Sequence, residues 1–218
     1  MTNNIEHLVQ TFISACFDVA KRGLVRCSSG NLSLRVDQER MLVTTSRSWM
    51  ESVTARDVCV CRISDGGPLE DKCPSVETGF HAAILQSRPE INAVLHFQTP
   101  CATALACREE RVNYHVIPEI PFYIGPIAKV PFLLPGTPEL ARTVTDAMRT
   151  HDMVTIANHG QVAVAADVAH VIQNAVFFEL ACEIVVRGED TLAPLPETQV
   201  QALLTLRSQV IQSDSNTV

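Results

Sequence analysis

The chain has 218 residues, of which 46% are apolar, and its net charge at pH 7 is -7. This length and apolar content predict one folded domain over residues 1–218 and exclude a disordered chain. The acidic balance argues against nucleic acid or an anionic membrane surface as a partner. It does not exclude an anionic substrate, because a few local cations suffice for one.

The composition also bears on the cellular compartment. No run approaches the roughly 20 apolar residues that span a bilayer. The N-terminal sequence MTNNIEHLVQ lacks the basic start and apolar run of a signal peptide. We therefore expect a cytoplasmic protein. Because a reducing compartment disfavours disulfides, we expect most of the eight cysteines to be buried or partly buried small apolar residues.

The first half of the chain predicts a helix, three strands, a second helix and a fourth strand. Apolar residues recur at helical spacing over residues 3–22, and Gly23 follows as a stop. A helix that begins at Pro74 and Ser75, with Ser75 as its cap, is expected to run to about residue 87. The strands of this half are expected at residues 31–36, 41–45, 57–63 and 92–97.

The second half alternates helices with strands. Prolines are concentrated in residues 114–138, where we expect strands and turns but no helix. Two strands are predicted within residues 153–166, meeting at residues 158–160. Because three strands separate the first two helices, a mixed sheet covered by helices fits better than a strictly alternating winding. Helices are expected at residues 102–107, 138–149, 167–187 and 197–212.

Two segments place polar side chains beside a glycine or a helix start. Residues 28–31, SSGN, form either an anion-binding nest or only a helix-to-strand turn with Gly30 at positive φ. In residues 74–77, PSVE, Ser75 and Glu77 either cap a helix or hold a carboxylate beside a metal or as a base. His81 shares a helix face with Glu77, a position more typical of a core or supporting histidine than of a ligand.

Two histidines are predicted at strand ends. His96 ends an apolar strand and shares its face with Gln98, whose amide oxygen is a weaker zinc ligand than an imidazole nitrogen. A histidine at this position is an unusual choice for packing alone. His159 stands beside Gly160, where the backbone can approach a site closely, and a surface turn is the alternative interpretation.

The motifs SSGNLSLR, PSVETGFHAAILQSRPEINAVLHFQTP and IANHGQVAVA occur in this order. They resemble the class II aldolase/adducin family from about residue 5 to residue 187. The resemblance implies an α/β fold of three layers, α/β/α, with a mixed and largely antiparallel central sheet. It also implies a divalent metal cofactor, zinc, and a homotetramer with its sites at subunit interfaces.

The resemblance also assigns roles to individual positions. His96 and His159 match metal ligands, and Glu77 matches a ligand that also serves as the base. Gln98 stands where the family has its middle metal histidine, so we include it as a candidate ligand. The expected contacts to a substrate phosphate are Ser28, Ser29, Gly30, Asn31, Ser46, Arg47 and Ser75.

Three further departures from the family pattern concern the substrate. Val76 stands where a second phosphate-binding serine is usual, and Arg47 stands where the family has a glycine. The family's proton-donating tyrosine has no clear counterpart, although Tyr114 and Tyr123 bracket the region. These positions bear on substrate choice more than on the fold.

The matched positions predict a metal-dependent lyase that cleaves a small ketose phosphate of the L-fuculose 1-phosphate type. The metal would stabilise an enediolate as the carbon–carbon bond breaks. Other family members epimerise or dehydrate sugar phosphates from the same enediolate. The rival from a different class is a non-catalytic protein that keeps the fold for binding or assembly, as adducin does. Gln98 and the missing tyrosine favour the rival, whereas Glu77 and the two histidines favour an enzyme.

Overall fold

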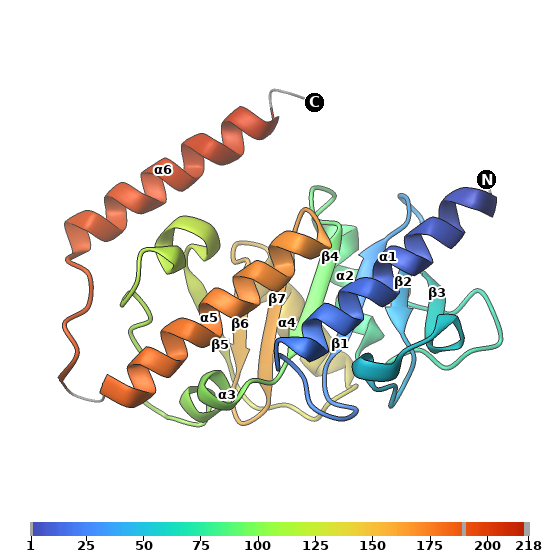
Figure 1. The fold of residues 1–218 in the computed structure, drawn as a ribbon, viewed down its shortest axis with the longest axis horizontal. Coiled ribbons are helices and arrows are strands. Elements are labelled where there is room, and N and C mark those ends of the chain that lie inside the picture. The colour runs from blue at the N-terminus through green and yellow to red at the C-terminus, as the bar shows by residue number, and fades with distance from the viewer. Residues whose placement is uncertain (1, 189–190, 216–218) are drawn as a thin grey trace.

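One mixed sheet of seven strands forms the centre of the computed structural model, which describes residues 2–188 and 191–215 (Figure 1). The ends of the predicted 1–218 domain lie outside the described residues. The strand order is β3-β2-β1-β4-β7-β6-β5, in which β5 and β6 are parallel and the other neighbours are antiparallel. The strands are β1 (Asn31–Arg35), β2 (Arg40–Thr44), β3 (Val58–Arg62), β4 (Ala93–Phe97), β5 (Ile127–Val130), β6 (Met153–Ile156) and β7 (Gly160–Ala165).

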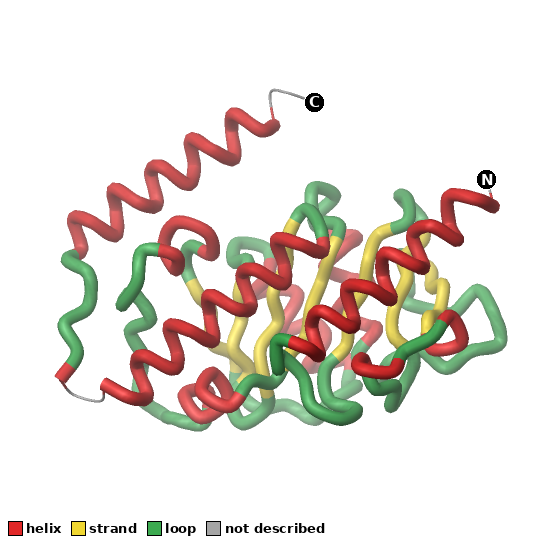
Figure 2. Tube along the Cα trace, in the orientation of Figure 1, coloured by secondary structure: helices red, strands yellow, loops and turns green. Residues whose placement is uncertain are grey.

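Helices cover both faces of this sheet, which confirms the predicted three layers (Figures 1 and 2). The long helices α1 and α5 and the short α3 cover one face, while α2 and α4 cover the other. The helices are α1 (Thr2–Lys21), α2 (Thr78–Ser87), α3 (Pro100–Ala106), α4 (Pro138–Met148), α5 (Val168–Gly188) and α6 (Glu197–Ser215).

Strand β4 lies at the middle of the sheet and is buried along its whole length. Its alternating side chains enter two different cores, as the period of two requires. Leu95 and Phe97 pack under α1, α3 and α5, and Val94 packs under α2 and α4. His96 shares the face of Val94, so it points toward the layer that contains α2.

The expectation that no run approaches the apolar length of a membrane span is wrong for α5, which among the described residues is the one helix long and apolar enough to cross a membrane. Length and composition alone are weak evidence, because the core helix of a globular fold passes the same test. The buried side of α5, from Val171 to Val185, packs against β4 and β7. The core therefore accounts for its apolar character.

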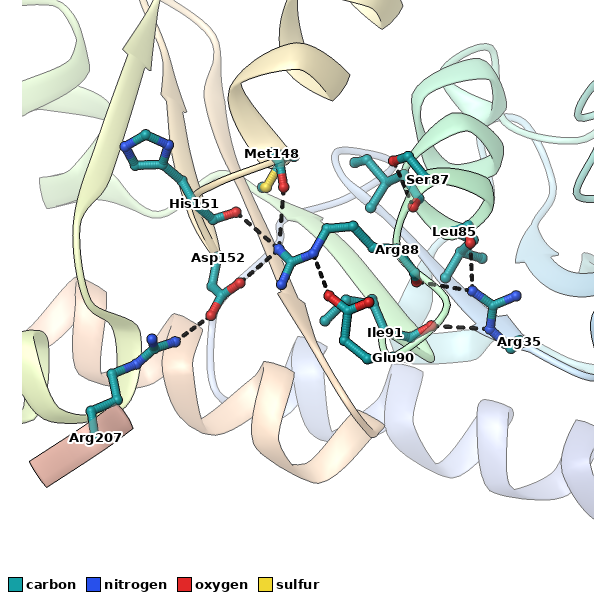
Figure 3. Close-up of polar contacts among 11 residues, drawn as sticks. Arg35, Leu85, Ser87, Arg88, Glu90, Ile91, Met148, His151, Asp152 and Arg207 are labelled. Atoms are coloured by element: carbon teal, nitrogen blue, oxygen red, sulfur yellow. Dashed lines mark hydrogen bonds and ion pairs between the residues drawn. The ribbon is translucent and has the colours of Figure 1, made fainter. Parts of the chain in front are cut away.

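A shared carboxylate ties α6 to the rest of the fold (Figure 3). Asp152, just before β6, accepts a hydrogen bond from Arg207 of α6 and one of 2.7 Å from Arg88 at the end of α2. Arg88 also donates to the carbonyls of Met148 and His151. One partly buried side chain thus connects α2, β6 and α6.

Two local predictions are wrong. Helix α2 begins at Thr78 rather than near residue 74. Pro74 forms an isolated bridge with Thr45, and the Ser75 N–H donates to the Thr44 carbonyl, so both residues are held beside the end of β2. The proline-rich segment does contain a helical turn, Ile120–Ile124, besides the expected strand. The missing N–H of a proline costs no helical hydrogen bond in the first turn, which is why Pro121 is tolerated there.

The cysteine prediction is confirmed. All eight cysteines are free thiols. Four of them are buried and Cys101 is partly buried. The four buried cysteines are Cys16, Cys59, Cys61 and Cys182.

Candidate metal centre

Three side chains that the sequence singled out meet at one end of strand β4. Glu77 directly precedes α2, His96 lies in β4, and His159 lies in the turn between β6 and β7. One oxygen or nitrogen atom from each lies within 4.8 Å of the others. Glu77 and His96 are buried, and the side chain of His159 is 9% exposed. This cluster is able to hold a metal ion.

The sheet and one glycine bring these residues together. Asn31 of β1 pairs with His96, and Gln161 of β7 pairs with Phe97 on the other side of β4. A Cβ atom on Gly160 would lie 2.7 Å from the Phe97 carbonyl oxygen and 3.0 Å from Cε1 of His96. Only a residue without a side chain lets the β6–β7 turn approach β4 this closely.

The hydrogen bond of the His96 ring fixes its tautomer. The Nδ1 atom lies 2.9 Å from the backbone carbonyl of Gln161, which can only accept, so Nδ1–H donates. The other ring nitrogen, Nε2, faces Glu77 and lies 3.4 Å from Oε2. A backbone carbonyl that holds the far side of a ring is the usual support for a metal-binding histidine.

The two oxygens of Glu77 differ in their partners. Oε2 accepts a hydrogen bond of 2.9 Å from the Asn31 side-chain amide. Oε1 is buried without a hydrogen-bond partner and lies 3.6 Å from Nε2 of His159. A buried carboxylate oxygen without a partner is costly, and a cation is the partner that best removes the cost.

The donor set therefore fits a divalent cation. Two imidazole nitrogens and a carboxylate oxygen are ligands that zinc accepts. Burial, together with the nearby His96, lowers the pKa of His159 although Glu77 acts in the opposite direction. The ring is thus neutral at pH 7, as a metal ligand must be.

Behind the cluster lies a second row of buried polar side chains. His81 Nε2 lies 2.5 Å from the Asn31 side-chain oxygen, and the hydroxyl of Ser33 lies 2.8 Å from His81 Nδ1. Burial, reinforced by His96, lowers the pKa of His81 to about 3, so its ring is neutral. The sequence predicts a core or supporting position for His81, whereas the position of Ser33 in this row was not predicted. The available signal was its place two residues after Asn31, on the same strand face.

The segment that was expected to bind phosphate forms a tight turn before β1. Gly30 has φ of +73°, and a Cβ there would lie 2.7 Å from the His96 carbonyl oxygen. The Ser29 hydroxyl accepts a hydrogen bond from the Arg26 N–H, and Ser28 is exposed. The Asn31 side chain is engaged at both ends by Glu77 and His81, and its backbone pairs with His96 of β4.

The remaining expected phosphate residues lie on two adjoining segments. The Ser46 N–H donates to the Cys73 carbonyl, which places the turn with Arg47 beside the segment with Ser75. Ser75 is buried, and its hydroxyl accepts from the Glu77 N–H at 3.3 Å. Arg47 is exposed and has φ of +62°, the left-handed conformation that favours glycine. Glu77, not Ser75, occupies the position before α2.

Gln98 and a cavity complete the surroundings. The Cγ atom of Gln98 lies 2.7 Å from where a Gly160 Cβ would be, so its side chain lies beside the β6–β7 turn. A cavity of about 340 Å³ that Val76, Glu77 and Phe80 help to line opens next to the cluster. Tyr114 and Tyr123 instead pack their rings against Phe178 and Phe177 of α5.

Comparison with known proteins gives consistent matches. The family described as the class II aldolase and adducin N-terminal domain matches residues 10–186. The chain is 30% identical to 3-oxo-tetronate 4-phosphate decarboxylase of Haemophilus influenzae, over 71% of this chain and 75% of that protein. It is 31% identical to L-fuculose phosphate aldolase of Escherichia coli, over 73% and 74% of the two chains. A solved structure of L-fuculose 1-phosphate aldolase superposes with a TM-score of 0.81 at 25% identity, covering 90% of this chain and 93% of that one.

Proposed function

Because the chain belongs to the class II aldolase and adducin family, we propose that it is a metal-dependent lyase that cleaves a small ketose phosphate of the L-fuculose 1-phosphate type. The observation that carries the proposal is the buried, unpartnered Oε1 of Glu77 beside two histidine nitrogens. A protein that kept the fold only for assembly would have no use for so costly an arrangement.

The proposed ligands are His96, His159 and Glu77, with the Gln98 amide beside them. A divalent cation, zinc in this proposal, would polarise the substrate carbonyl and stabilise the negative charge that develops as the adjacent bond breaks. Glu77 would move the proton on the carbon left by the departing group. Asn31 and the burial around the cluster would keep that carboxylate oriented and shielded from water.

We assign the phosphate of the substrate to the neighbouring turns. Ser28, Ser29 and Gly30 offer hydroxyls and a backbone with positive φ, which is the geometry of an anion-binding nest. Ser46, Arg47 and Ser75 lie on the adjoining segments, and Arg47 would add a charge-assisted contact. Asn31 follows Gly30, but its side chain is engaged by Glu77 and His81.

A second candidate reaction is decarboxylation of a phosphorylated 3-oxo acid, the substrate type in the name of the Haemophilus influenzae relative. One observation favours it. Aldol cleavage needs a second group to handle the proton of the leaving aldehyde, whereas loss of carbon dioxide does not. Both tyrosines near the expected position pack against α5 instead.

We also propose that the protein works in the cytoplasm as a homotetramer with its sites at subunit interfaces, as the resemblance implies. A neighbouring subunit would then supply the missing acid of the aldol reaction. Sedimentation of the purified protein decides the oligomeric state, and a monomer that is fully active would contradict this arrangement.

The test compares wild type with Glu77→Gln and with Glu139→Gln. Glu139 is an exposed carboxylate in the first turn of α4, so it controls for losing a charge at a helix start. Metal content is measured by elemental analysis, and turnover is measured with L-fuculose 1-phosphate and 3-oxo-tetronate 4-phosphate. We expect bound metal in wild type and a loss of turnover of about 10²-fold or more only in Glu77→Gln. Wild type without metal or turnover would refute the enzyme proposal and favour the adducin-like alternative.

A further inference from the structure

The hydrogen bonds behind the cluster form a continuous chain from Ser33 through His81 and Asn31 to Glu77. The successive distances are 2.8, 2.5 and 2.9 Å. All four residues are at most 6% exposed. Water therefore cannot replace a lost member easily, and each donor must match an acceptor.

The direction of each bond follows from the end of the chain at Glu77. The Glu77 carboxylate accepts, so the group of Asn31 that faces it must be the NH₂ group, which donates. The oxygen of Asn31 then faces His81 and accepts, so His81 Nε2 carries the hydrogen. His81 Nδ1 is consequently the acceptor, and the Ser33 hydroxyl donates to it.

These hydrogen-bond directions fix the orientation of the Glu77 carboxylate. If the Asn31 amide were flipped, its oxygen would face Oε2 of Glu77 and repel it. The Nε2–H of His81 prevents the flip, because a flipped amide would place two donors against each other. These hydrogen bonds therefore hold Oε2 of Glu77 in place and leave Oε1 as the oxygen without a hydrogen bond.

We propose that Ser33, His81 and Asn31 are positioning residues that orient Glu77, with Oε1 directed to the cation and the substrate. The Asn31 side chain accordingly serves the carboxylate and not the substrate phosphate. The inference rests on the proposed function only for the use of Oε1. The hydrogen-bond order itself is independent of any activity.

The first experiment tests the direction of these hydrogen bonds in the full-length wild-type protein. Nitrogen-15 NMR of labelled histidines distinguishes the two tautomers, and the His81 signals are identified by their loss in His81→Gln. We expect the hydrogen on Nε2 and none on Nδ1. A hydrogen on Nδ1 would overturn the proposal. Because this measurement needs neither metal nor substrate, it decides the hydrogen-bond order even if the proposed enzyme activity fails.

The second experiment measures the effect on the cluster with Co²⁺ alone and with inorganic phosphate alone. Replacing a group that supports a metal ligand typically weakens metal binding by about 10- to 100-fold. We expect that loss, and an altered visible spectrum of bound Co²⁺, in His81→Leu and Asn31→Ala. His81→Gln retains a donor toward Asn31 and should recover most of the affinity. Phosphate binding should stay unchanged in all three variants.

The control is Thr155→Val. It removes a partly buried hydrogen bond from the buried Thr155 to the Ala128 carbonyl, which is not part of the series from Ser33 to Glu77. It should leave Co²⁺ binding unchanged while reporting the general cost of a lost buried hydrogen bond. If His81→Leu does not fold, Ser33→Ala replaces it and should alter the Co²⁺ spectrum in the same direction. Normal Co²⁺ binding together with lost phosphate binding in Asn31→Ala would show that this side chain is a phosphate ligand and the proposal is wrong. Wild type that shows the expected tautomer but binds no Co²⁺ would refute the proposed metal-dependent function and the assignment of Oε1, while supporting the hydrogen-bond order.

Discussion

Gln98 is the residue at which the proposed metal centre departs most from the family pattern. Its amide oxygen donates less to zinc than an imidazole nitrogen does. We expect Gln98→His to bind zinc more tightly, measured by competition against a chelating dye. An unchanged affinity, together with a structure in which residue 98 turns away from His96, would falsify the idea that this position faces the metal.

Gly160 leaves no room for a side chain beside the cluster. In Gly160→Ala the new methyl would meet backbone oxygen of Phe97 at 2.7 Å, and the turn with His159 must move. We expect weaker metal binding, measured by the same competition. The control is Gly79→Ala in α2, where the new methyl meets only Ala141 at 3.6 Å. That variant should bind metal normally. Its free energy of unfolding should rise by about 0.5 to 1 kcal/mol, because alanine has a higher helix propensity than glycine. Equal metal affinity in the two variants would contradict this account.

Arg47 adopts a left-handed backbone conformation that is unfavourable for any residue with a Cβ atom. Its side chain makes no hydrogen bond or ion pair within the described part of the chain, so nothing there offsets the strain. We expect Arg47→Gly to raise the free energy of unfolding by about 0.5 to 1 kcal/mol. We also expect it to weaken phosphate binding by about 10-fold, the scale of one lost charge-assisted hydrogen bond.

Thermal unfolding and calorimetric titration with inorganic phosphate measure the two effects of Arg47→Gly. Arg47→Ala separates them, because alanine removes the charge and keeps the strained conformation. It should lose phosphate affinity without gaining stability. Unchanged phosphate binding in both variants would mean that Arg47 serves only the turn.

The start of α5 shows how pH should act on one element. Asp167 directly precedes α5, and its carboxylate accepts from the backbone N–H and the ring of His170. Burial raises the pKa of Asp167, but these hydrogen bonds outweigh it and the net pKa lies below the usual range. The carboxylate therefore stabilises the fold above the unfolded pKa of about 3.9, and this contribution is lost as pH falls through the lower folded value.

We expect Asp167→Ala to lower the free energy of unfolding by about 1 kcal/mol near neutral pH, which is the usual cost of losing a helix cap. The difference should begin to shrink below about pH 4, where the carboxylate of the unfolded chain takes up a proton, and should be lost as pH falls through the lower pKa of the folded protein. Urea unfolding of both proteins at several pH values measures it. A difference that persists undiminished below pH 3 would show that charge is not its source.

At the scale of elements, periodicity predicted most of the fold, because the long amphipathic helices and the alternating strands depend on local patterns. It placed three strands before α2 and the turn at residues 158–160 correctly. The predicted start of α2 was wrong, because the Ser75 N–H donates to the carbonyl of Thr44, which is distant in sequence, and Pro74 forms a bridge with Thr45. No local signal contains that information.

The residues of the candidate metal centre were also predicted only in part. The structure brings Glu77, His96 and His159 together. The Gln161 carbonyl that fixes the His96 ring was not predictable, since a backbone carbonyl carries no side-chain signature. The engagement of Asn31 by His81 likewise depends on strand β1 facing α2. Roles that pass through backbone groups or neighbouring elements require the three-dimensional structure.

For the whole molecule, the Asp152 carboxylate is one of the groups that hold α6, which also packs against the turn Ile120–Ile124. We expect Arg207→Gln to increase hydrogen exchange in α6 while exchange in β6 stays slow, since Arg88 still pairs with Asp152. The expected cost is about 1.5 to 3 kcal/mol for a hydrogen bond to a charged group, read from exchange in α6. Mass spectrometry of peptides resolves the two regions.

Arg187→Gln provides the control for Arg207→Gln. It removes an exposed ion pair with Glu183 on α5, which is worth about 0.5 kcal/mol or less. Exchange in α6 should therefore remain at the wild-type level. The same fast exchange of α6 in both variants, or unchanged exchange in Arg207→Gln, would mean that the shared carboxylate does not hold this helix.

The order in which the ribosome delivers the three cluster residues follows from their places in the sheet. Glu77 and His96 emerge long before His159, and β4 lacks its neighbour β7 until that later segment has been synthesised. A chain arrested after α4 has neither the third donor nor the strand that positions it. Capture of the proposed ion would therefore be a late event in biosynthesis. Prematurely terminated products should be unable to bind it, and the unpaired edge at β4 should expose them to aggregation or proteolysis.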